Sequence, residues 1–278
     1  MGGLMTGTGP LGRHPAGSYN AELHVPDHLL YLEPSPKRIR VEFGGQVIAD
    51  SRNAKPLFET AHLPVYYLPR EDVRQDLLQP TDHSSHCPVK GDASYWSVVV
   101  GDRRAENAVW GYPEPLSAST WLLDHQAFYW HKMDAWYEEE EQVFVHPRDP
   151  YCRLEVLDSS RHVRVLVHDQ VVADSRRPKM LMESGLPVRY YLPRDDVRMD
   201  LLTPTETSTQ CPYKGTASYW AVRNGDEVVK DPVWTYTDPL REVAPIRDLL
   251  CFYSEREGVD VEVDGEVTDD PYSPFIRR

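Results

Sequence analysis

The chain has 278 residues, which is enough for two domains of ordinary size, each with its own core. Hydrophobic residues make up 40% of it, which argues against disorder. The sequence contains no run of about eighteen apolar residues, so it predicts no transmembrane span. The formal net charge of -14 disfavours nonspecific nucleic-acid binding, because such binding needs Lys and Arg to neutralise phosphates. We therefore expect neither a nucleic-acid nor a membrane partner.

Residues 1–36 are rich in Gly and Pro and lack the apolar core of a signal peptide, so we expect a flexible segment and a cytoplasmic protein. The cysteines show no Cys-x-x-Cys spacing, which argues against a structural zinc site. Without a secretion signal we expect no disulfide framework either. The sequence thus predicts no metal and no cofactor. The four cysteines are Cys87, Cys152, Cys211 and Cys251.

The same domain occurs twice in the chain. The run Tyr-Tyr-Leu-Pro-Arg at residues 66–70 recurs 124 residues later at residues 190–194, and the register holds without a gap into the closing aromatic segment. About half of the aligned positions are identical, which indicates a duplicated domain and not a short-period solenoid. We place the first copy at residues 37–157 and the second at residues 158–278.

Each copy begins with the pattern of a β-hairpin. Hydrophobic residues alternate with polar ones over residues 39–43, and Gly44-Gly45 separates them from Val47 and Ile48, which predicts strand, tight turn and strand. A short β-type run at residues 65–68 follows. The stretch from Pro69 to Leu78 then carries a helix signature, with Pro at its start and acidic residues early.

A loop rich in Ser, Thr, Pro and Gly is predicted from Gln79 to Ala93, before a strand at residues 94–98. A second hairpin turn at Gly101-Asp102 leads to a strand with Trp110, and residues 127–145 read as aromatic and extended. The expected fold is mainly β. It consists of two copies of a compact β-rich domain, each with one short helix.

If residues 69–78 are helical, two arginines lie one turn apart on one stripe, where like charges repel by about 0.2–0.5 kcal/mol. Both copies keep this arrangement, as Arg70 with Arg74 and Arg194 with Arg198. Salt bridges to other strands would resolve the conflict. The functional alternative is an arginine pair that binds a carboxylate or phosphate.

The densest shared segment is Cys-Pro-x-Lys-Gly-x-Ala-Ser-Tyr-Trp, which begins at Cys87. Gly91 would let the backbone approach a ligand, and the preceding lysine offers a mobile cation. The adjacent aromatics alternate across a strand, so we expect one in the core and one at a cleft or partner. The alternative is a tight turn followed by a core strand. These candidate ligand-binding residues are Lys90, Tyr95 and Trp96, with Lys214, Tyr219 and Trp220 in the second copy.

Other chemistry-bearing patterns are weak. Cys87 follows His86, but the second copy has Gln210 in place of that histidine, so both cysteines of the shared segment read better as small buried hydrophobes. Asp72 and Asp76 form a carboxylate pair too common to specify a metal. The sequence therefore leaves the catalytic residues unknown.

The ordered motifs at residues 47–52, 66–74, 86–91 and 146–151 resemble the family called domain of unknown function 427. The resemblance covers residues 37–157 and again 160–275. It implies a compact β-rich domain, akin to the β-tent of Mss4-like proteins, with occurrence in bacteria and fungi. The family is sometimes labelled nucleotidyltransferase-like, but the Gly-Ser and Asp-x-Asp pattern of those enzymes is missing here.

Three functions remain open at this point. The first is binding of a small anionic or aromatic molecule in a pocket lined by Arg, Lys, Tyr and Trp. The second is a phosphate-handling, nucleotidyltransferase-like enzyme with a titratable residue of perturbed pKa beside Lys90. The third is a protein-interaction module that uses aromatic surface residues of the first copy alone, namely Trp121, Trp130 and Trp136.

Overall fold

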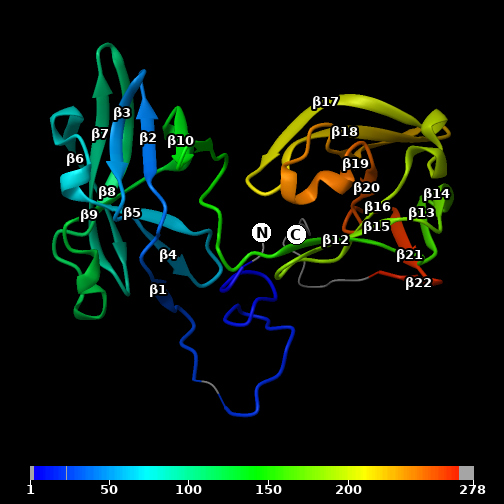
Figure 1. Cartoon of the computed structure of the whole chain (residues 1–278), viewed down its shortest axis with the longest axis horizontal. Helices are drawn as coiled ribbons and strands as arrows, with labels where there is room; N and C mark the ends of the chain where they lie inside the picture. The colour runs from blue at the N-terminus through cyan, green and yellow to red at the C-terminus, as the bar shows by residue number, and fades with distance from the viewer. Residues whose placement is uncertain (1–2, 23, 269–278) are drawn as a thin grey trace. The chain divides into compact units, whose positions relative to one another are not determined.

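The computed structural model describes residues 3–22 and 24–268, and it divides them into two compact units. One unit holds residues 24–148, and the other combines residues 3–22 with residues 149–268. Each unit contains one copy of the duplicated domain (Figure 1). The N-terminal segment packs within the second unit, where the backbone N–H of Thr8 donates to the carbonyl of Gly185 at 3.3 Å.

The first copy is built from two antiparallel sheets. The strand orders are β1-β4-β5-β9-β8-β7-β6 in the seven-stranded sheet and β11-β10-β2-β3 in the smaller one. The strands are β1 (Leu30–Leu32), β2 (Ile39–Phe43), β3 (Gln46–Ser51), β4 (Lys55–Glu59), β5 (Val65–Pro69), β6 (Leu78–Cys87), β7 (Gly91–Val100), β8 (Arg103–Gly111), β9 (His125–Phe128), β10 (Ala135–Glu138) and β11 (Glu141–Gln142). The short 3-10 helices are η1 (Arg70–Asp72), η2 (Gln75–Leu77), η3 (Ser117–Leu122) and η4 (Trp130–Lys132).

The second copy repeats this order. Its large sheet appears as β12-β15-β16 and β17-β18-β19-β20, which an antiparallel bridge between Leu192 and Leu250 joins, and its small sheet is β14-β13-β21-β22. The strands are β12 (Leu154–Asp158), β13 (Val163–Val167), β14 (Gln170–Ser175), β15 (Lys179–Glu183), β16 (Arg189–Tyr191), β17 (Leu202–Cys211), β18 (Gly215–Asn224), β19 (Glu227–Thr235), β20 (Leu250–Phe252), β21 (Val259–Val263) and β22 (Glu266–Val267). The helices are η5 (Arg194–Asp196), η6 (Met199–Leu201) and η7 (Arg241–Ile246). The prediction of a mainly β protein with two copies is confirmed.

Both predicted hairpins of the first copy form where the turn residues indicated. β2 pairs with β3 across Gly44-Gly45, whose φ angles of 61° and 74° suit glycine, and β7 pairs with β8 across Gly101-Asp102. The short run after the first hairpin is β5, and it also agrees with the prediction. Local turn chemistry therefore sets these registers.

The middle of the large sheet of the first copy is buried on both faces. Successive side chains of a strand point to opposite faces, and β5 shows the result. Tyr66 and Leu68 join the core between the two sheets, whereas Tyr67 joins a second cluster on the other face. This second cluster includes Leu122 of η3. A strand buried on both sides has to be apolar throughout, which explains the continuous run at residues 65–68.

The prediction of one continuous helix at residues 69–78 is wrong. The segment forms two separate 3-10 turns, η1 and η2, with extended Val73 between them at φ -112° and ψ 134°. Val73 makes an antiparallel bridge to Ala49, and the N–H of Arg74 donates to the carbonyl of Ile48 at 2.8 Å. Pairing with β3 thus competes with a continuous helix, and the second copy shows the same bridge from Val197.

The predicted loop from Gln79 to Ala93 is also wrong, because most of it is strand β6. This strand lies at the edge of the sheet and is largely exposed, so its polar composition needs no hydrophobic alternation. Pro80 is tolerated there, and the register shifts between Pro80 and Ser84. The edge position, which the sequence does not reveal, accounts for the error.

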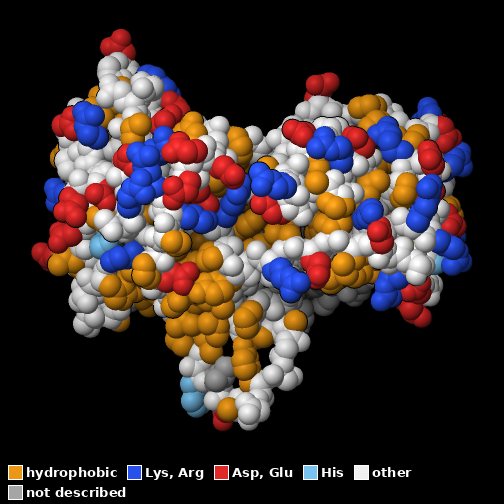
Figure 2. Space-filling model, in the orientation of Figure 1, with side chains coloured by type: hydrophobic (Ala, Val, Ile, Leu, Met, Phe, Trp, Pro, Cys, Tyr) orange, Lys and Arg blue, Asp and Glu red, His pale blue; other side chains and the backbone are white. Residues whose placement is uncertain are grey.

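The surface of the first copy carries interleaved charges over β2 and β10 (Figure 2). Arg38 pairs with Asp50 at 2.5 Å, and Arg40 pairs with Glu140 at 2.7 Å. Such exposed pairs contribute little to stability. Among the described residues, no helix has the length and hydrophobicity to cross a membrane.

The turn of the first hairpin provides a test of the fold. Gly44 and Gly45 both have positive φ, but a Cβ on Gly44 would lie 2.8 Å from Cβ of Val100, whereas one on Gly45 would meet nothing within 4 Å. Gly45→Ala should lower the free energy of unfolding by about 1–2 kcal/mol through backbone strain alone. Gly44→Ala should cost more than that. Urea denaturation of the two variants measures the difference, and equal costs would contradict this packing.

Candidate functional site

A buried ion pair joins two distant parts of the first copy. Nζ of Lys90, in the turn between β6 and β7, lies 2.6 Å from Oε2 of Glu59 at the end of β4. The two side chains are 9% and 13% exposed. Lys90 also lies over the ring of Tyr112, 5.9 Å from its centroid. Lys90 is thus a structured cation with a partner, and not the mobile cation that the sequence suggested.

The pair implies a strongly curved sheet. Four strand-to-strand steps separate β4 from β7 in the sheet order. At about 4.8 Å per step, a flat sheet would hold these strands roughly 19 Å apart. Two extended side chains do not bridge that distance, so the sheet curls over the cluster that contains Tyr67 and Tyr95. The ion pair closes this curl.

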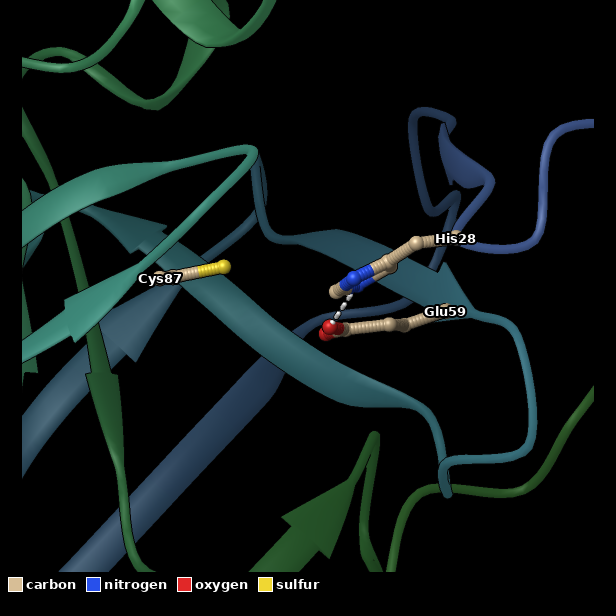
Figure 3. Close-up of side chains that lie close together, drawn as sticks. All are labelled: His28, Glu59 and Cys87. Atoms are coloured by element: carbon tan, nitrogen blue, oxygen red, sulfur yellow. Dashed lines mark hydrogen bonds and ion pairs between the residues drawn. The ribbon is translucent and has the colours of Figure 1, made fainter.

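Glu59 is the centre of a small polar network (Figure 3). Its Oε1 also contacts Nε2 of His28, whose ring stacks on that of His62 with centroids 6.3 Å apart. Burial by itself would raise the pKa of Glu59. The hydrogen bond and charge of Lys90, with the hydrogen bond of His28, outweigh burial and lower that pKa. The carboxylate is therefore ionised and already engaged at both oxygens.

The second copy keeps the same pair, as Lys214 with Glu183. The position of His28 is taken by Cys152, whose Sγ donates to Glu183 at 3.7 Å. Burial and the charge of Glu183 raise the pKa of Cys152 to about 12, so this thiol stays protonated. Burial lowers and the charge of Glu183 raises the pKa of Lys214, and the charge prevails, so this lysine stays charged and is a poor nucleophile.

His28, Glu59 and Cys87 are the side chains of this network that could hold a metal ion, with ligand atoms all within 4.8 Å of one another (Figure 3). The position of Lys90 argues against metal binding, because its ammonium group donates to the carboxylate of Glu59 that a metal ion would need. A metal would have to displace that group. The arrangement fits a buried ion-pair network better than a metal site.

A cavity of about 540 Å³ lies beside the ion pair in the first copy. Glu59 and Lys90 line it, and most of the remaining wall is aromatic or apolar. In Figure 2, hydrophobic side chains gather over the β4 end of this unit. Its wall includes Val65, Tyr67, Trp110, Tyr129, Trp130, His131 and Trp136.

The aromatic walls form two ring pairs. Trp110 and Tyr129 have centroids 4.6 Å apart at 41°, and Trp130 stacks on Trp136 at 4.2 Å and 6°. Nε1 of Trp110 donates to the hydroxyl of Tyr67 at 3.2 Å, which holds the first pair in place. Burial raises the pKa of Tyr129 to about 12, so its hydroxyl is a hydrogen-bonding group and not an anion.

The second copy places a charged side chain of its own over the corresponding ring pair. Arg189 takes the strand position of Val65, because it pairs with Leu181 as Val65 pairs with Leu57. Its guanidinium donates to both carboxylate oxygens of Glu255, at 2.6 and 3.1 Å, and these side chains are 9% and 5% exposed. A separate small pocket of about 10 Å³, roughly one water molecule, lies beside Arg189 on the side of Val163 and Val165.

The structure separates the predicted arginines from this cavity. Arg70 follows the far end of β5 from Val65, roughly 16 Å along the strand. Arg70 is exposed and donates to Gln75 at 3.2 Å, and Arg74 pairs with Asp76 at 2.6 Å. The second copy shows the same exposed arrangement, in which Arg198 pairs with Asp200 at 2.6 Å and Arg194 lies over the ring of Trp220.

The predicted aromatic pair divides between the two faces of β7. Tyr95 is buried in the cluster beneath the curl, with its hydroxyl 2.7 Å from Oγ of Ser85, whereas Trp96 packs against the core between the sheets. In the second copy, Tyr219 and Trp220 divide in the same way. Of the predicted site residues in the first copy, the cavity lining includes Lys90.

Three lining features escaped the sequence prediction. Glu59 was not singled out, although its acid recurs as Glu183. Trp130 and Trp136 were expected on an exposed surface, but Trp136 is 3% exposed and both line the cavity. Their replacement by Ser254 and Asp260 in the second copy was a usable signal that this region differs between the copies.

Comparison with known families gives one result. The family described as domain of unknown function (DUF427) matches residues 31–139 and again residues 155–266. The chain therefore belongs to this family and carries two copies of its domain. No curated protein matches the chain.

Removing one partner of the buried Glu59–Lys90 ion pair should strongly destabilise the fold. Lys90→Met leaves the carboxylate of Glu59 buried without its cation and should lower the free energy of unfolding by about 3–5 kcal/mol. Adding Glu59→Leu should recover part of that loss. Arg74→Met, which breaks an exposed pair, serves as the control and should leave the urea midpoint unchanged. A Lys90→Met variant as stable as this control would contradict the proposed closure.

The lowered pKa of Glu59 predicts a pH dependence. Its ordinary value is 4.5, so the stability that this shift contributes is fully present above about pH 4.5 and is lost as the pH falls through the lowered value. Glu59→Gln lacks this contribution. The difference in unfolding free energy between wild type and Glu59→Gln, followed by urea titration from pH 7 downwards, should shrink below that pH. A constant difference would refute the assignment.

Proposed function

We propose that the first copy binds a small molecule with a flat aromatic body in the cavity beside Glu59 and Lys90. The observation that carries the proposal is the contrast between the two copies. Their sheets and their buried ion pairs correspond, yet the first copy has a cavity of about 540 Å³ against its ring pair, whereas the second copy covers the matching rings with Arg189. A fold that covers these rings in one copy and leaves them open to a cavity in the other has a use for the opening.

The size and lining of the cavity support a small-molecule ligand. Binding pockets for such ligands measure about 300–1,000 Å³ and combine apolar walls with a few polar groups. Here the walls include Trp110, Tyr129 and Trp130, and the polar groups include the hydroxyl of Tyr67. Offset or edge-to-face contacts with such rings stabilise a bound aromatic group by about 0.5–1.5 kcal/mol each beyond area burial.

The charges favour an aromatic ligand over a simple anion. Lys90 is the cation predicted for anion binding, but Glu59 neutralises it at 2.6 Å. The arginines of the same prediction, Arg70 and Arg74, lie at the other end of β5. An anion at Lys90 would therefore have to compete with a buried carboxylate.

The chemistry near the cavity gives less support to phosphate transfer. That hypothesis requires a titratable group suited to proton transfer beside Lys90. Glu59 has a lowered pKa and is a weak base near neutral pH, and the raised pKa of Tyr112 keeps its hydroxyl protonated. Binding without a reaction is the simpler proposal.

A ligand screen with a cavity-filling variant tests the proposal. Val65→Arg/Trp130→Ser/His131→Glu gives the first copy the residues found at 189, 254 and 255 of the second. We expect indole, adenine or a related flat aromatic probe to raise the melting temperature of wild type. A probe at a hundredfold excess over its Kd adds about 2.7 kcal/mol. The filled variant should show no such shift.

The net charge of the filled variant equals that of wild type with histidine neutral, so nonspecific attraction is matched. Its circular dichroism spectrum and melting temperature without probe verify that it folds. If it does not fold, Trp130→Ala, which removes one wall, replaces it as the control. Shifts of equal size in wild type and in the folded variant would refute the proposal, as would an absence of any hit among aromatic probes.

A further inference from the structure

We infer that the molecule bound in the first-copy cavity carries a flat delocalised cation, of the amidinium or guanidinium type, which lies against Trp110 and Tyr129. This inference rests on the proposed function and names the ligand class for the same site. It derives from the group that the second copy places in the equivalent space. The duplication thus supplies a side chain in the role of a ligand.

Arg189 shows what the aromatic pair can hold. Its Cζ lies 5.6 Å from the ring centroid of Trp234 and 5.8 Å from that of Tyr253. These two rings are 4.2 Å apart at 41°, and Nε1 of Trp234 donates to the hydroxyl of Tyr191 at 3.1 Å. A guanidinium group suits this position because it is planar, weakly hydrated and attracted to ring faces.

The first copy preserves the receiving surface and lacks the arginine. Trp110 and Tyr129 correspond to Trp234 and Tyr253, with nearly the same spacing and the same 41° angle. The bond from Trp110 to Tyr67 matches that from Trp234 to Tyr191. At the position of Arg189 the first copy has Val65, which is too short to cover the rings. The surface that accepts a guanidinium in one copy therefore faces an open cavity in the other.

The charges around the cavity are compatible with a cation. Glu59 lines it as an ionised carboxylate, shared with Lys90 and His28. His131 stands where Glu255 binds the arginine, so the ligand lacks that counterion and depends more on the ring faces. Lys132 lies over the ring of Tyr129 at 4.9 Å and donates to the carbonyl of Glu106 at 2.7 Å, so it is a charge that the ligand must avoid. This geometry favours a flat cation over a bulky one.

Benzamidine and benzamide form a matched pair of probes for this inference. They share size and shape, and at neutral pH the first is a cation and the second is neutral. Isothermal titration calorimetry at one fixed salt concentration should give benzamidine a Kd about tenfold lower than that of benzamide, the gain expected of a desolvated cation against ring faces. The filled variant Val65→Arg/Trp130→Ser/His131→Glu should bind neither, because its own arginine covers the rings.

The outcomes separate the inference from the proposed function. Tighter binding of benzamidine that disappears in the filled variant supports both. If benzamide binds as tightly as benzamidine, or more tightly, the inference of a cationic ligand is wrong, whereas the proposed binding of an aromatic molecule is supported. Benzamidine binding that persists in the folded filled variant reflects attraction to the acidic surface and also overturns the inference. Binding of neither probe overturns the inference, and the aromatic screen then decides the proposed function separately.

Discussion

The contact on which the architecture depends is the buried ion pair between Glu59 and Lys90. It joins strands that lie four steps apart in the sheet, so it can form only if the sheet curls. The curl encloses an aromatic cluster and gives the sheet a second buried face. A buried pair is seldom stabilising by itself relative to apolar residues. Its role here is geometric, since it selects the curved arrangement of strands.

The two copies share this closure and differ in what lies next to it. Lys214 and Glu183 repeat the pair, and Tyr191 and Trp234 repeat the hydrogen-bonded aromatic unit. They differ beside the cavity, where Val65 becomes Arg189, Trp130 becomes Ser254 and His131 becomes Glu255. Because Val65 and Arg189 occupy the same strand position, one copy can cover its ring pair without changing its fold.

Paired charges and open aromatic surface together set the chemistry of the first copy. The cations most visible in the sequence are all engaged, Lys90 by a buried carboxylate and Arg74 by an exposed one. What remains available to a ligand is ring surface with few polar groups. The arginine of the second copy indicates how such surface is used when it is covered. The scaffold that the two copies share and the differing residues beside the cavity therefore have separate roles.

The sequence by itself determined the duplication, the mainly β class and the hairpin turns. Gly44-Gly45 and Gly101-Asp102 act locally, because backbone conformation and two-residue periodicity depend on neighbours in the chain. Only the tertiary structure decided that residues 78–87 form an edge strand, that Val73 bridges to β3 in place of a helix, and that Lys90 meets Glu59. It also turned Trp136 from an expected surface residue into a cavity wall. These features depend on how far the sheet curls and on which distant strands it brings together, and no local pattern of residues encodes that distance.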